Sequence, residues 1–306
     1  MQTTIASPVT LSGVGVHSGR YATMKMFPAR ANTGIVFCRT DIEDADCCIL
    51  AHAQNAIEAQ LCTRIENSAG VGVTMIEHVM AAFHALGIDN ILIEIDSSEV
   101  PILDGSSAQI VELLNRAGTT SLDAPRHYIE IIAPVMAKLD NGAWAELSPA
   151  DSLQIDIDID FDDPGIGKQA CHFDSALDEF SDEIAHARTF CLHRDVEKMQ
   201  QAGLGKGGSL QNAIVYRDGE IMNKGGLRMD NECVKHKALD CIGDLFLLGM
   251  AVKGKLTAHM PGHRLSTILV RKMLESPESF RIVTQDESRA ISAAGTMPAM
   301  AVANSA

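Results

Sequence analysis

The chain has 306 residues, a length that suits one large domain or two domains of about 150 residues each. With 25 Lys and Arg against 40 Asp and Glu, its formal net charge at pH 7 is −15, which excludes a general nucleic-acid-binding protein because such proteins rely on basic surface. Hydrophobic residues make up 46% of the sequence, which is enough for a sizeable core and too much for a wholly disordered chain.

The N-terminal part predicts short strands followed by two helices. Strand patterns occur over 9–16, 21–27, 34–39 and 91–95. A helix is expected over 74–86, where Thr74 and Glu77 match a capping box and Gly87 supplies the stop. A second helix is expected over 107–117.

The breaker-rich stretch GTTSLDAPR (118–126) is the best candidate for a linker. Beyond it, strands are expected over 128–132, 143–147, 153–161 and 256–260, and helices over 175–187, over 231–249 and from Ser266 onward. Both parts combine strands with helices, which predicts an α+β fold with an N-terminal domain at 1–122 and a C-terminal domain at 127–285. Residues 286–306 are small and nearly uncharged, so we expect a flexible tail, with protease recognition as its functional alternative.

The eight cysteines form no CxxC pair, although Cys47 and Cys48 are adjacent. Their spacing matches neither a disulfide framework nor a cysteine zinc site, so reduced cysteines in a cytoplasmic protein are expected. The N-terminus MQTTIASPVT does not resemble a signal peptide. The most apolar run, 241–252, is interrupted by Asp244 and is too short to span a bilayer, which argues against stable membrane insertion.

Two of the expected helices carry polar residues that apolar helices rarely contain without a reason. Glu77 and His78 are adjacent in the first helix. In the second, His236, Asp240 and Asp244 recur every fourth residue and therefore share one helix face. Three N or O ligands with an open position are typical of a catalytic zinc site, so His78, His236 and Asp240 are candidate ligands and Glu77 a candidate base.

Each of these residues also has a purely structural explanation. His78 could be a hydrogen-bonded core histidine, and Glu77 could serve the capping box alone. His236 and Asp240 could form a surface ion pair, although their apolar neighbours favour a buried helix, in which polar groups need a partner or a metal.

Three further polar features lie between and beyond these helices. His263 follows Pro-Gly in an expected turn, where it could act as a general acid or simply be an exposed histidine. The Thr189 hydroxyl could stabilise an oxyanion. The glycine-rich segment GLGKGGS (203–209) lacks the Gly-Lys-Ser/Thr ending of a Walker A loop, so a flexible turn is expected there.

A set of collinear motifs extends over most of the chain. They are GVGVHSG (13–19), ANTG (31–34), TMIEH (74–78), LGIDN (86–90), VPILDGS (100–106), ARTF (187–190), GGS (207–209), HKALDCIGDL (236–245) and GH (262–263). In order and spacing they resemble the UDP-3-O-acyl-N-acetylglucosamine deacetylases, a family of zinc amidases in lipid A synthesis.

The resemblance implies a role for each polar residue. His78, His236 and Asp240 stand where the family binds one catalytic Zn²⁺, a set of ligands that Fe²⁺ can also occupy. Glu77 stands at the general base that activates the attacking water. His84, six residues after His78, is expected to face elsewhere and to be structural.

The resemblance further assigns the groups around the reacting amide. His263 matches the general acid for the departing amine, and Asp244 matches the residue that orients it. Thr189 and Lys237 match groups near the developing oxyanion.

The implied fold is two similar α+β domains, each a helix layer packed on a β-sheet, with the helices sandwiched between the two sheets. An insert at about 191–219 would form an apolar tunnel for the acyl chain, where Phe190, Val196, Ser209 and Val215 would bind the substrate.

The implied activity is zinc-dependent hydrolysis of the N-acetyl group of UDP-3-O-((R)-3-hydroxyacyl)-N-acetylglucosamine, which gives acetate and the free amine. This is the committed step of lipid A biosynthesis in the cytoplasm of Gram-negative bacteria. Met260 and Ala143 stand where basic residues are common in the family, so Arg264 or Lys237 would contact the diphosphate instead. Two alternatives stay open: a related zinc amidase with another acetylated substrate, and a non-catalytic protein that binds a sugar nucleotide or lipid.

Overall fold

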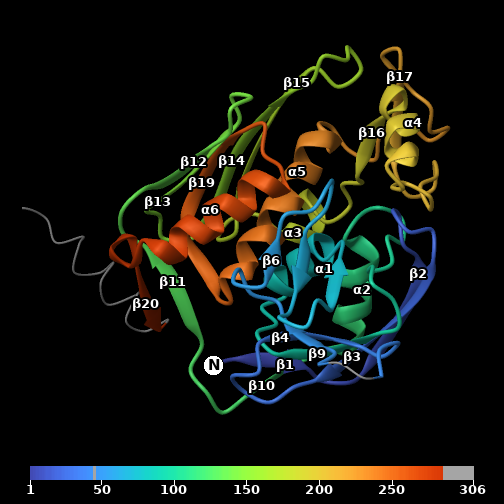
Figure 1. The fold of residues 1–306 in the computed structure, drawn as a ribbon. Helices are drawn as coiled ribbons and strands as arrows, with labels where there is room; N and C mark the ends of the chain where they lie inside the picture. The colour runs from blue at the N-terminus through green and yellow to red at the C-terminus, as the bar shows by residue number, and fades with distance from the viewer. Residues whose placement is uncertain (44–45, 285–306) are drawn as a thin grey trace, which may run out of the picture.

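The computed structural model of the protein describes residues 1–43 and 46–284. Within this part of the chain, helices combine with several β-sheets in a mixed fold (Figure 1). The helices are α1 (Glu77–Ala85), α2 (Ala108–Ala117), α3 (Phe180–Glu183), α4 (His193–Gln201), α5 (Glu232–Leu245) and α6 (His263–Glu275), with 3₁₀ turns η1 (Phe246–Leu248) and η2 (Pro277–Ser279). The tail expected at 286–306, with its protease signal, lies outside the described residues.

A five-stranded sheet is formed within the first 95 residues. Its order is β2 (Val9–Val14), β3 (Tyr21–Pro28), β9 (Ile91–Ile95), β4 (Ile35–Arg39) and β5 (Cys48–Leu50). Strands β4 and β9 run parallel, and the other neighbours run antiparallel. Along β9, Ile91, Ile93 and Ile95 are buried while Leu92 and Glu94 are not, so the period of two turns one face of this strand toward the core.

A seven-stranded sheet is formed by the later part of the chain. Its main order is β12 (Val135–Lys138), β13 (Trp144–Ser148), β19 (Ala251–His259), β11 (His127–Ile131) and β20 (Phe280–Thr284), and β14 (Leu153–Asp160) pairs with β19 and with β15 (Lys168–Asp174). The sequence LQIDIDID of β14 buries its apolar residues and turns its aspartates outward. That alternation is typical of a sheet with one face on the core and one face in water.

Three small sheets complete the described fold. They are β1 (Thr3–Ile5) with β10 (Thr119–Ser121); β6 (Ala56–Ile57), β7 (Arg64–Glu66) and β8 (Gly72–Thr74); and β16 (Phe190–Leu192), β17 (Ile214–Arg217) and β18 (Glu220–Ile221). The last of these lies beside α4, at the edge of the molecule in Figure 1.

The helices α1, α2, α5 and α6 lie between the two large sheets in Figure 1. Helix α5 packs against α1 on one side and against α6, β14 and β15 on others, so it is buried almost all round, as its apolar sequence predicts. Its crossing with α1 is close at Gly243, where a Cβ atom would lie 2.0 Å from the backbone oxygen of Glu77. Only a glycine permits that approach.

Most of the strands and helices expected from the sequence are present, with ends that differ by a few residues. The helix predicted over 175–187 is wrong. There β15 continues to Asp174, and only the single turn α3 follows. The Asp174 carboxylate accepts hydrogen bonds from the Ala176 N–H and the Ser152 hydroxyl, which favours a turn over a helix start at this point.

The cysteines also depart from expectation. Cys38 and Cys48 face each other across β4 and β5 and form a disulfide, with their Cα atoms 4.0 Å apart. The prediction that all cysteines are reduced is therefore wrong for this pair. Strand pairing brings these residues together, which their spacing of ten residues did not reveal.

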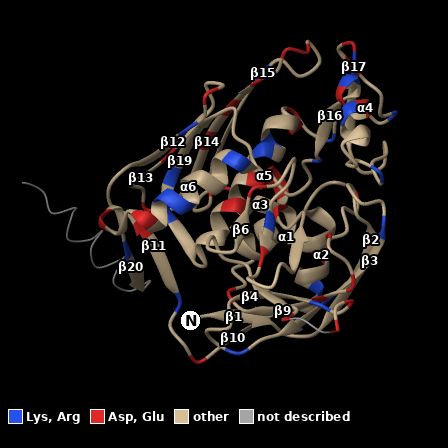
Figure 2. Cartoon of the chain, in the orientation of Figure 1, with Lys and Arg blue, Asp and Glu red and all other residues tan. Residues whose placement is uncertain are grey.

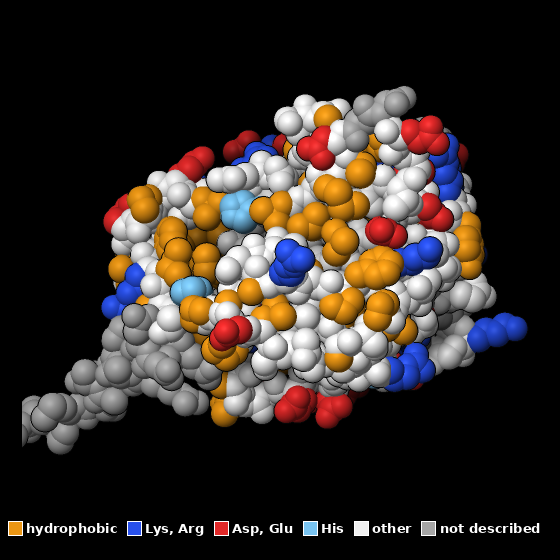
Figure 3. Space-filling model, turned by 90° about the horizontal axis from the view of Figure 1, so that it is seen from below, with side chains coloured by type: hydrophobic (Ala, Val, Ile, Leu, Met, Phe, Trp, Pro, Cys, Tyr) orange, Lys and Arg blue, Asp and Glu red, His pale blue; other side chains and the backbone are white. Residues whose placement is uncertain are grey.

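The surface of the described residues mixes residue types. Figure 2 shows acidic and basic residues interspersed over helices and strands. On the face seen in Figure 3, hydrophobic side chains lie in small groups between charged and other side chains. Within residues 1–43 and 46–284, no helix combines the length and the apolar character needed to cross a membrane.

Candidate functional site

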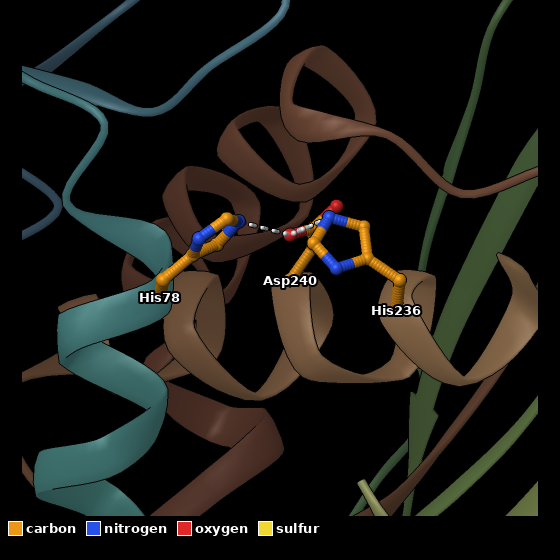
Figure 4. A group of neighbouring side chains, drawn as sticks. All are labelled: His78, His236 and Asp240. Atoms are coloured by element: carbon orange, nitrogen blue, oxygen red, sulfur yellow. Dashed lines mark ion pairs between the residues drawn. The ribbon is translucent and has the colours of Figure 1, made fainter. Parts of the chain in front are cut away.

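Two helices from distant parts of the chain bring three metal-ligand side chains together. His78 lies in the first turn of α1, and His236 and Asp240 lie one turn apart on α5. One ligand atom from each residue lies within 4.8 Å of the other two. Figure 4 shows both imidazole rings directed toward the Asp240 carboxylate.

The geometry of this group fits a metal ion. Oδ1 of Asp240 lies 3.6 Å from Nε2 of His78 and 3.4 Å from Nε2 of His236. Ligand atoms bound at about 2.0 Å to one tetrahedral zinc lie roughly 3.3 Å apart, so a small closure would suffice. Asp240 Oδ1 is also buried without a hydrogen-bond partner among the described residues, and a cation would satisfy it.

The protonation states of the group suit metal binding as well. Burial lowers the pKa of His236 to about 3, although Asp240 opposes the shift, so the imidazole is neutral. Its Nδ1–H donates to the backbone oxygen of Ala187 at 3.1 Å, which leaves the Nε2 lone pair for a metal. Burial would raise the pKa of Asp240, but its interactions with the neighbouring His236 and with the ammonium group of Lys237 hold it well below its ordinary value.

Glu77 occupies the first residue of α1 but does not serve as a cap. The predicted capping box is wrong, because Ile76 is the residue before the helix and no side chain caps it. The Thr74 hydroxyl instead donates to the backbone oxygen of Ser98. The Glu77 carboxylate accepts a hydrogen bond from the backbone N–H of Thr63 at 3.0 Å. A helix cap therefore does not explain the presence of Glu77.

The carboxyl of Glu77 faces an imidazole across the site. Its Oε1 lies 3.6 Å from Nε2 of His263, and its side chain is 1% exposed. Burial raises the pKa of Glu77, and the charge of His263 opposes that shift. A carboxyl with a raised pKa that stays close to a cation is suited to accept and release a proton.

A second carboxylate, that of Asp244, contacts His263 at the ring nitrogen that faces away from Glu77. His263 is the first residue of α6, whereas the sequence placed it in a turn before a helix that starts near Ser266. Its Nδ1 lies 3.1 Å from Oδ2 of Asp244. Burial disfavours the charged ring, but Asp244 and then Glu77 outweigh it and raise the pKa of His263 to about 9. The imidazole is therefore a proton donor at neutral pH.

A mostly apolar cavity of about 720 Å³ opens onto these groups. Its lining includes the metal-ligand residues, Glu77 and His263, together with side chains from the segment around α4, β16 and β17. The substrate-binding residues expected there, Phe190, Val196, Ser209 and Val215, all line it. The cavity thus joins a polar end to an apolar one.

Thr189 and Lys237, expected near an oxyanion, also line the cavity. The Nζ atom of Lys237 donates to Oδ2 of Asp240 at 2.9 Å and lies 5.8 Å from the centre of the Phe190 ring. The backbone of Thr189 is fixed between Gly105 and Ile214 by hydrogen bonds of 2.8 Å each. The ammonium group of Lys237 is thereby placed at the polar end.

Comparison with known proteins gives a consistent result. The family model described as LpxC, UDP-3-O-acyl N-acetylglycosamine deacetylase, matches residues 2–275. The chain belongs to this family.

Curated proteins of the same family are similar in sequence to this chain along nearly their whole length. A UDP-3-O-acyl-N-acetylglucosamine deacetylase from Phenylobacterium zucineum is 44% identical over 291 residues, which cover 94% of this chain and 98% of the relative. A protein of the same name from Pasteurella multocida is 40% identical, over 95% of this chain and 95% of the relative. Another from Histophilus somni is 39% identical, over 97% of this chain and 98% of the relative. These deacetylases are hydrolases, and this chain is a hydrolase as well.

Two residues beside the site of this LpxC-family chain were missed by the sequence analysis. Thr63 contacts Glu77, Asp244 and His263, but a lone threonine in a loop carries no pattern that would mark it. His17 lines the cavity, and its ring nitrogens are buried without hydrogen-bond partners among the described residues. Its place in the motif GVGVHSG was the one available signal.

His84 lies away from the group, as expected. Its ring packs edge-on against Phe246 with the ring centres 5.3 Å apart. Burial lowers the pKa of His84 to about 4. A neutral imidazole packed on an aromatic ring is typical of a structural histidine.

Proposed function

We propose that the protein hydrolyses the N-acetyl group of UDP-3-O-((R)-3-hydroxyacyl)-N-acetylglucosamine with one bound Zn²⁺, the committed step of lipid A biosynthesis, in the cytoplasm of a Gram-negative bacterium. The observation that carries this proposal is the grouping of His78, His236 and Asp240 beside Glu77 and His263, at the polar end of an apolar cavity. Membership of the deacetylase family supports the choice of substrate.

His78, His236 and Asp240 would hold the metal. When bound there, Zn²⁺ would supply Lewis-acid polarisation of the amide carbonyl and lower the pKa of the attacking water. His236 stays oriented through its hydrogen bond to Ala187, and Lys237 shares the carboxylate of Asp240.

Glu77 would act as the general base and His263 as the general acid. The Glu77 carboxylate takes a proton from the attacking water, which its raised pKa favours. His263, protonated below a pKa of about 9, gives a proton from Nε2 to the departing amine. Asp244 stabilises the cationic form of His263 from the Nδ1 side.

Thr189 and Lys237 would stabilise the negative charge that develops on the carbonyl oxygen. The ammonium group of Lys237 is a point charge next to the reaction centre, and its interaction with Asp240 raises its pKa despite burial. Removal of one such donor typically lowers kcat by about 10² to 10³.

The apolar part of the cavity would hold the acyl chain. Phe190, Val196, Ser209 and Val215 would line that tunnel, which the insert at 191–219 provides. Met260 and Ala143 also line the cavity, so the basic contacts to the diphosphate would come from Arg264 or Lys237. Arg264 pairs with the exposed Glu58, and an incoming diphosphate would compete for it.

The same proposal covers the domain organisation. Two similar α+β domains, at 1–122 and 127–285, would each place a helix layer on a sheet and face each other through their helices. The short link between β10, which ends at Ser121, and β11, which starts at His127, supports this division.

The test is acetate release from the acylated UDP-sugar by the purified protein. We expect turnover that chelation removes and stoichiometric Zn²⁺ restores, and a loss of about 10² to 10⁴ in kcat for Glu77→Ala. Turnover of a non-acylated acetyl sugar at an equal kcat/KM would indicate a different amidase. Binding of the substrate without any acetate release would indicate a non-catalytic binding protein.

A further inference from the structure

Thr63 is a buried residue at the centre of the site that the mechanism above does not use. It lies directly before β7 and is 3% exposed. Its hydroxyl oxygen lies 2.5 Å from Oδ1 of Asp244 and 3.0 Å from Nδ1 of His263, and its backbone N–H donates to Oε2 of Glu77. One residue thus touches the base, the acid and the carboxylate behind the acid.

We infer that Thr63 is a positioning residue: its hydroxyl accepts a hydrogen bond from the Nδ1–H of His263 and so fixes the ring orientation in which Nε2 of the imidazolium presents the transferable proton. This inference rests on the proposed function, which makes His263 the general acid. Thr63 does not line the cavity, so it acts through His263 and Asp244 rather than on the substrate.

The direction of each hydrogen bond follows from the chemistry of the three groups. An ionised Asp244 offers only acceptors, so the Thr63 hydroxyl donates its one proton to Asp244 Oδ1. The hydroxyl oxygen then has only lone pairs to offer His263, so Nδ1 carries a hydrogen and donates to it. Asp244 Oδ2, 3.1 Å from the same Nδ1, accepts as well.

These hydrogen bonds at Nδ1 also fix the position of the other ring nitrogen of His263, Nε2. With Nδ1–H held by two acceptors, the ring cannot flip without losing both contacts. Nε2 therefore stays between the two carboxylates on the metal side, 3.6 Å from Glu77 Oε1 and 3.8 Å from Asp240 Oδ2. This is the position from which a proton can reach the leaving amine.

The backbone of Thr63 contributes separately from its side chain. Its N–H holds Oε2 of Glu77, which leaves Oε1 on the side of His263. A substitution of the side chain keeps this contact, so the effect of the hydroxyl on His263 can be measured without disturbing the base.

Thr63→Val and Thr63→Ser form the deciding pair, because the first removes the hydroxyl at nearly constant shape and the second keeps it. Thr74→Val is the matched control: it removes a hydroxyl from β8, the strand that pairs with β7. The Thr74 hydroxyl donates to the backbone oxygen of Ser98. All variants are compared as zinc-loaded protein for kcat, KM, bound zinc, Tm and the ¹H–¹⁵N spectrum of the histidine rings.

We expect Thr63→Val to lower kcat at least tenfold, with KM within about twofold and bound zinc unchanged, since positioning an acid–base group contributes through the transition state. Its His263 Nδ1–H signal should shift or exchange faster with water. Thr63→Ser should regain most of kcat and the wild-type signal, and Thr74→Val should match the wild type in both.

Wild-type kcat in Thr63→Val would overturn the inference. So would a loss of kcat in Thr63→Val that Thr63→Ser fails to restore, because the hydroxyl would then not be the group that matters. If the wild type itself released no acetate, the proposed function would fail; an unchanged His263 signal in Thr63→Val would then overturn the positioning role independently.

Discussion

His263 and Glu77 lie 3.6 Å apart within the site, and each influences the charge of the other. The carboxylate raises the pKa of the imidazole, and the imidazolium opposes the rise that burial causes in the pKa of the carboxyl. Protons therefore bind to the pair as a coupled unit. Asp244 biases this unit toward a charged His263, which is the form that a general acid needs.

At this scale we predict that Asp244→Asn lowers the pKa of His263. Burial lowers this pKa and Asp244 is the largest influence that raises it to about 9, so without the charge of Asp244 the effect of burial should bring the pKa down. Because the acid must be protonated, the loss of kcat at high pH should begin at lower pH in the variant. A ring-nitrogen NMR titration of the metal-free protein measures the shift directly. An unchanged pKa would contradict the role given to Asp244.

At the scale of elements, the site depends on how closely α1 and α5 cross. His78 belongs to α1, and His236 and Asp240 belong to α5, so their ligand atoms meet only if the two helix backbones approach each other. Gly243 permits this approach because a side chain there would overlap the backbone of Glu77. The glycine in the motif therefore has a packing reason as well as a place in the family pattern.

We predict that Gly243→Ala separates the two helices and weakens metal binding. A Cβ atom 2.0 Å from the oxygen of Glu77 cannot be accommodated without a shift of backbone, and overpacking of this kind typically costs about 1–3 kcal/mol or more. Gly225→Ala is the control, since a Cβ there would meet nothing within 4 Å. Urea unfolding and zinc titration should both distinguish the two variants. Equal stability and equal zinc affinity would contradict the close crossing.

Local patterns predicted those elements whose residues alternate or repeat clearly. The isoleucine–aspartate alternation of β14 and the apolar surroundings of His236 on α5 are of this kind. The helix expected over 175–187 failed because hydrogen bonds to Asp174 favour a turn, and the capping box failed because Glu77 is held by Thr63 across the fold. Thr63 lies 14 residues before Glu77, so helix periodicity carries no information about this contact. The turn at Asp174 depends on a local side-chain hydrogen bond, which periodicity does not describe either.

Local sequence patterns likewise predicted only part of the candidate site. The spacing of His236 and Asp240 on one helix face, together with His78 on a second apolar helix, predicted these three residues as candidate metal ligands, and the resemblance to a family then assigned the role of each. Neither residue spacing nor the family resemblance predicted Thr63, because its type and its spacing do not distinguish it from other loop threonines. Only the fold shows that it reaches His263.

At the scale of the whole molecule, the site joins segments from the beginning, middle and end of the described chain. The cavity wall is closed where the loop around His17 meets the glycine-rich loop of the insert. There the N–H groups of Lys206 and Gly207 donate to the backbone oxygens of His17 and Val16. A Cβ atom on Gly207 would lie 2.3 Å from the backbone oxygen of Gly15, so this contact also depends on a glycine. The segment at 203–209, read from the sequence as a flexible turn, thus completes the cavity.

The zinc bound per chain in single-residue variants tests the central claim most directly. In protein purified with zinc, the wild type, Glu77→Ala and the structural control His84→Ala should each hold about one ion, because all three keep the full ligand set. His78→Ala and His236→Ala, one from each helix, should each lose the ion. Stoichiometric zinc in either of these two variants, or its loss in Glu77→Ala alone, would contradict the account.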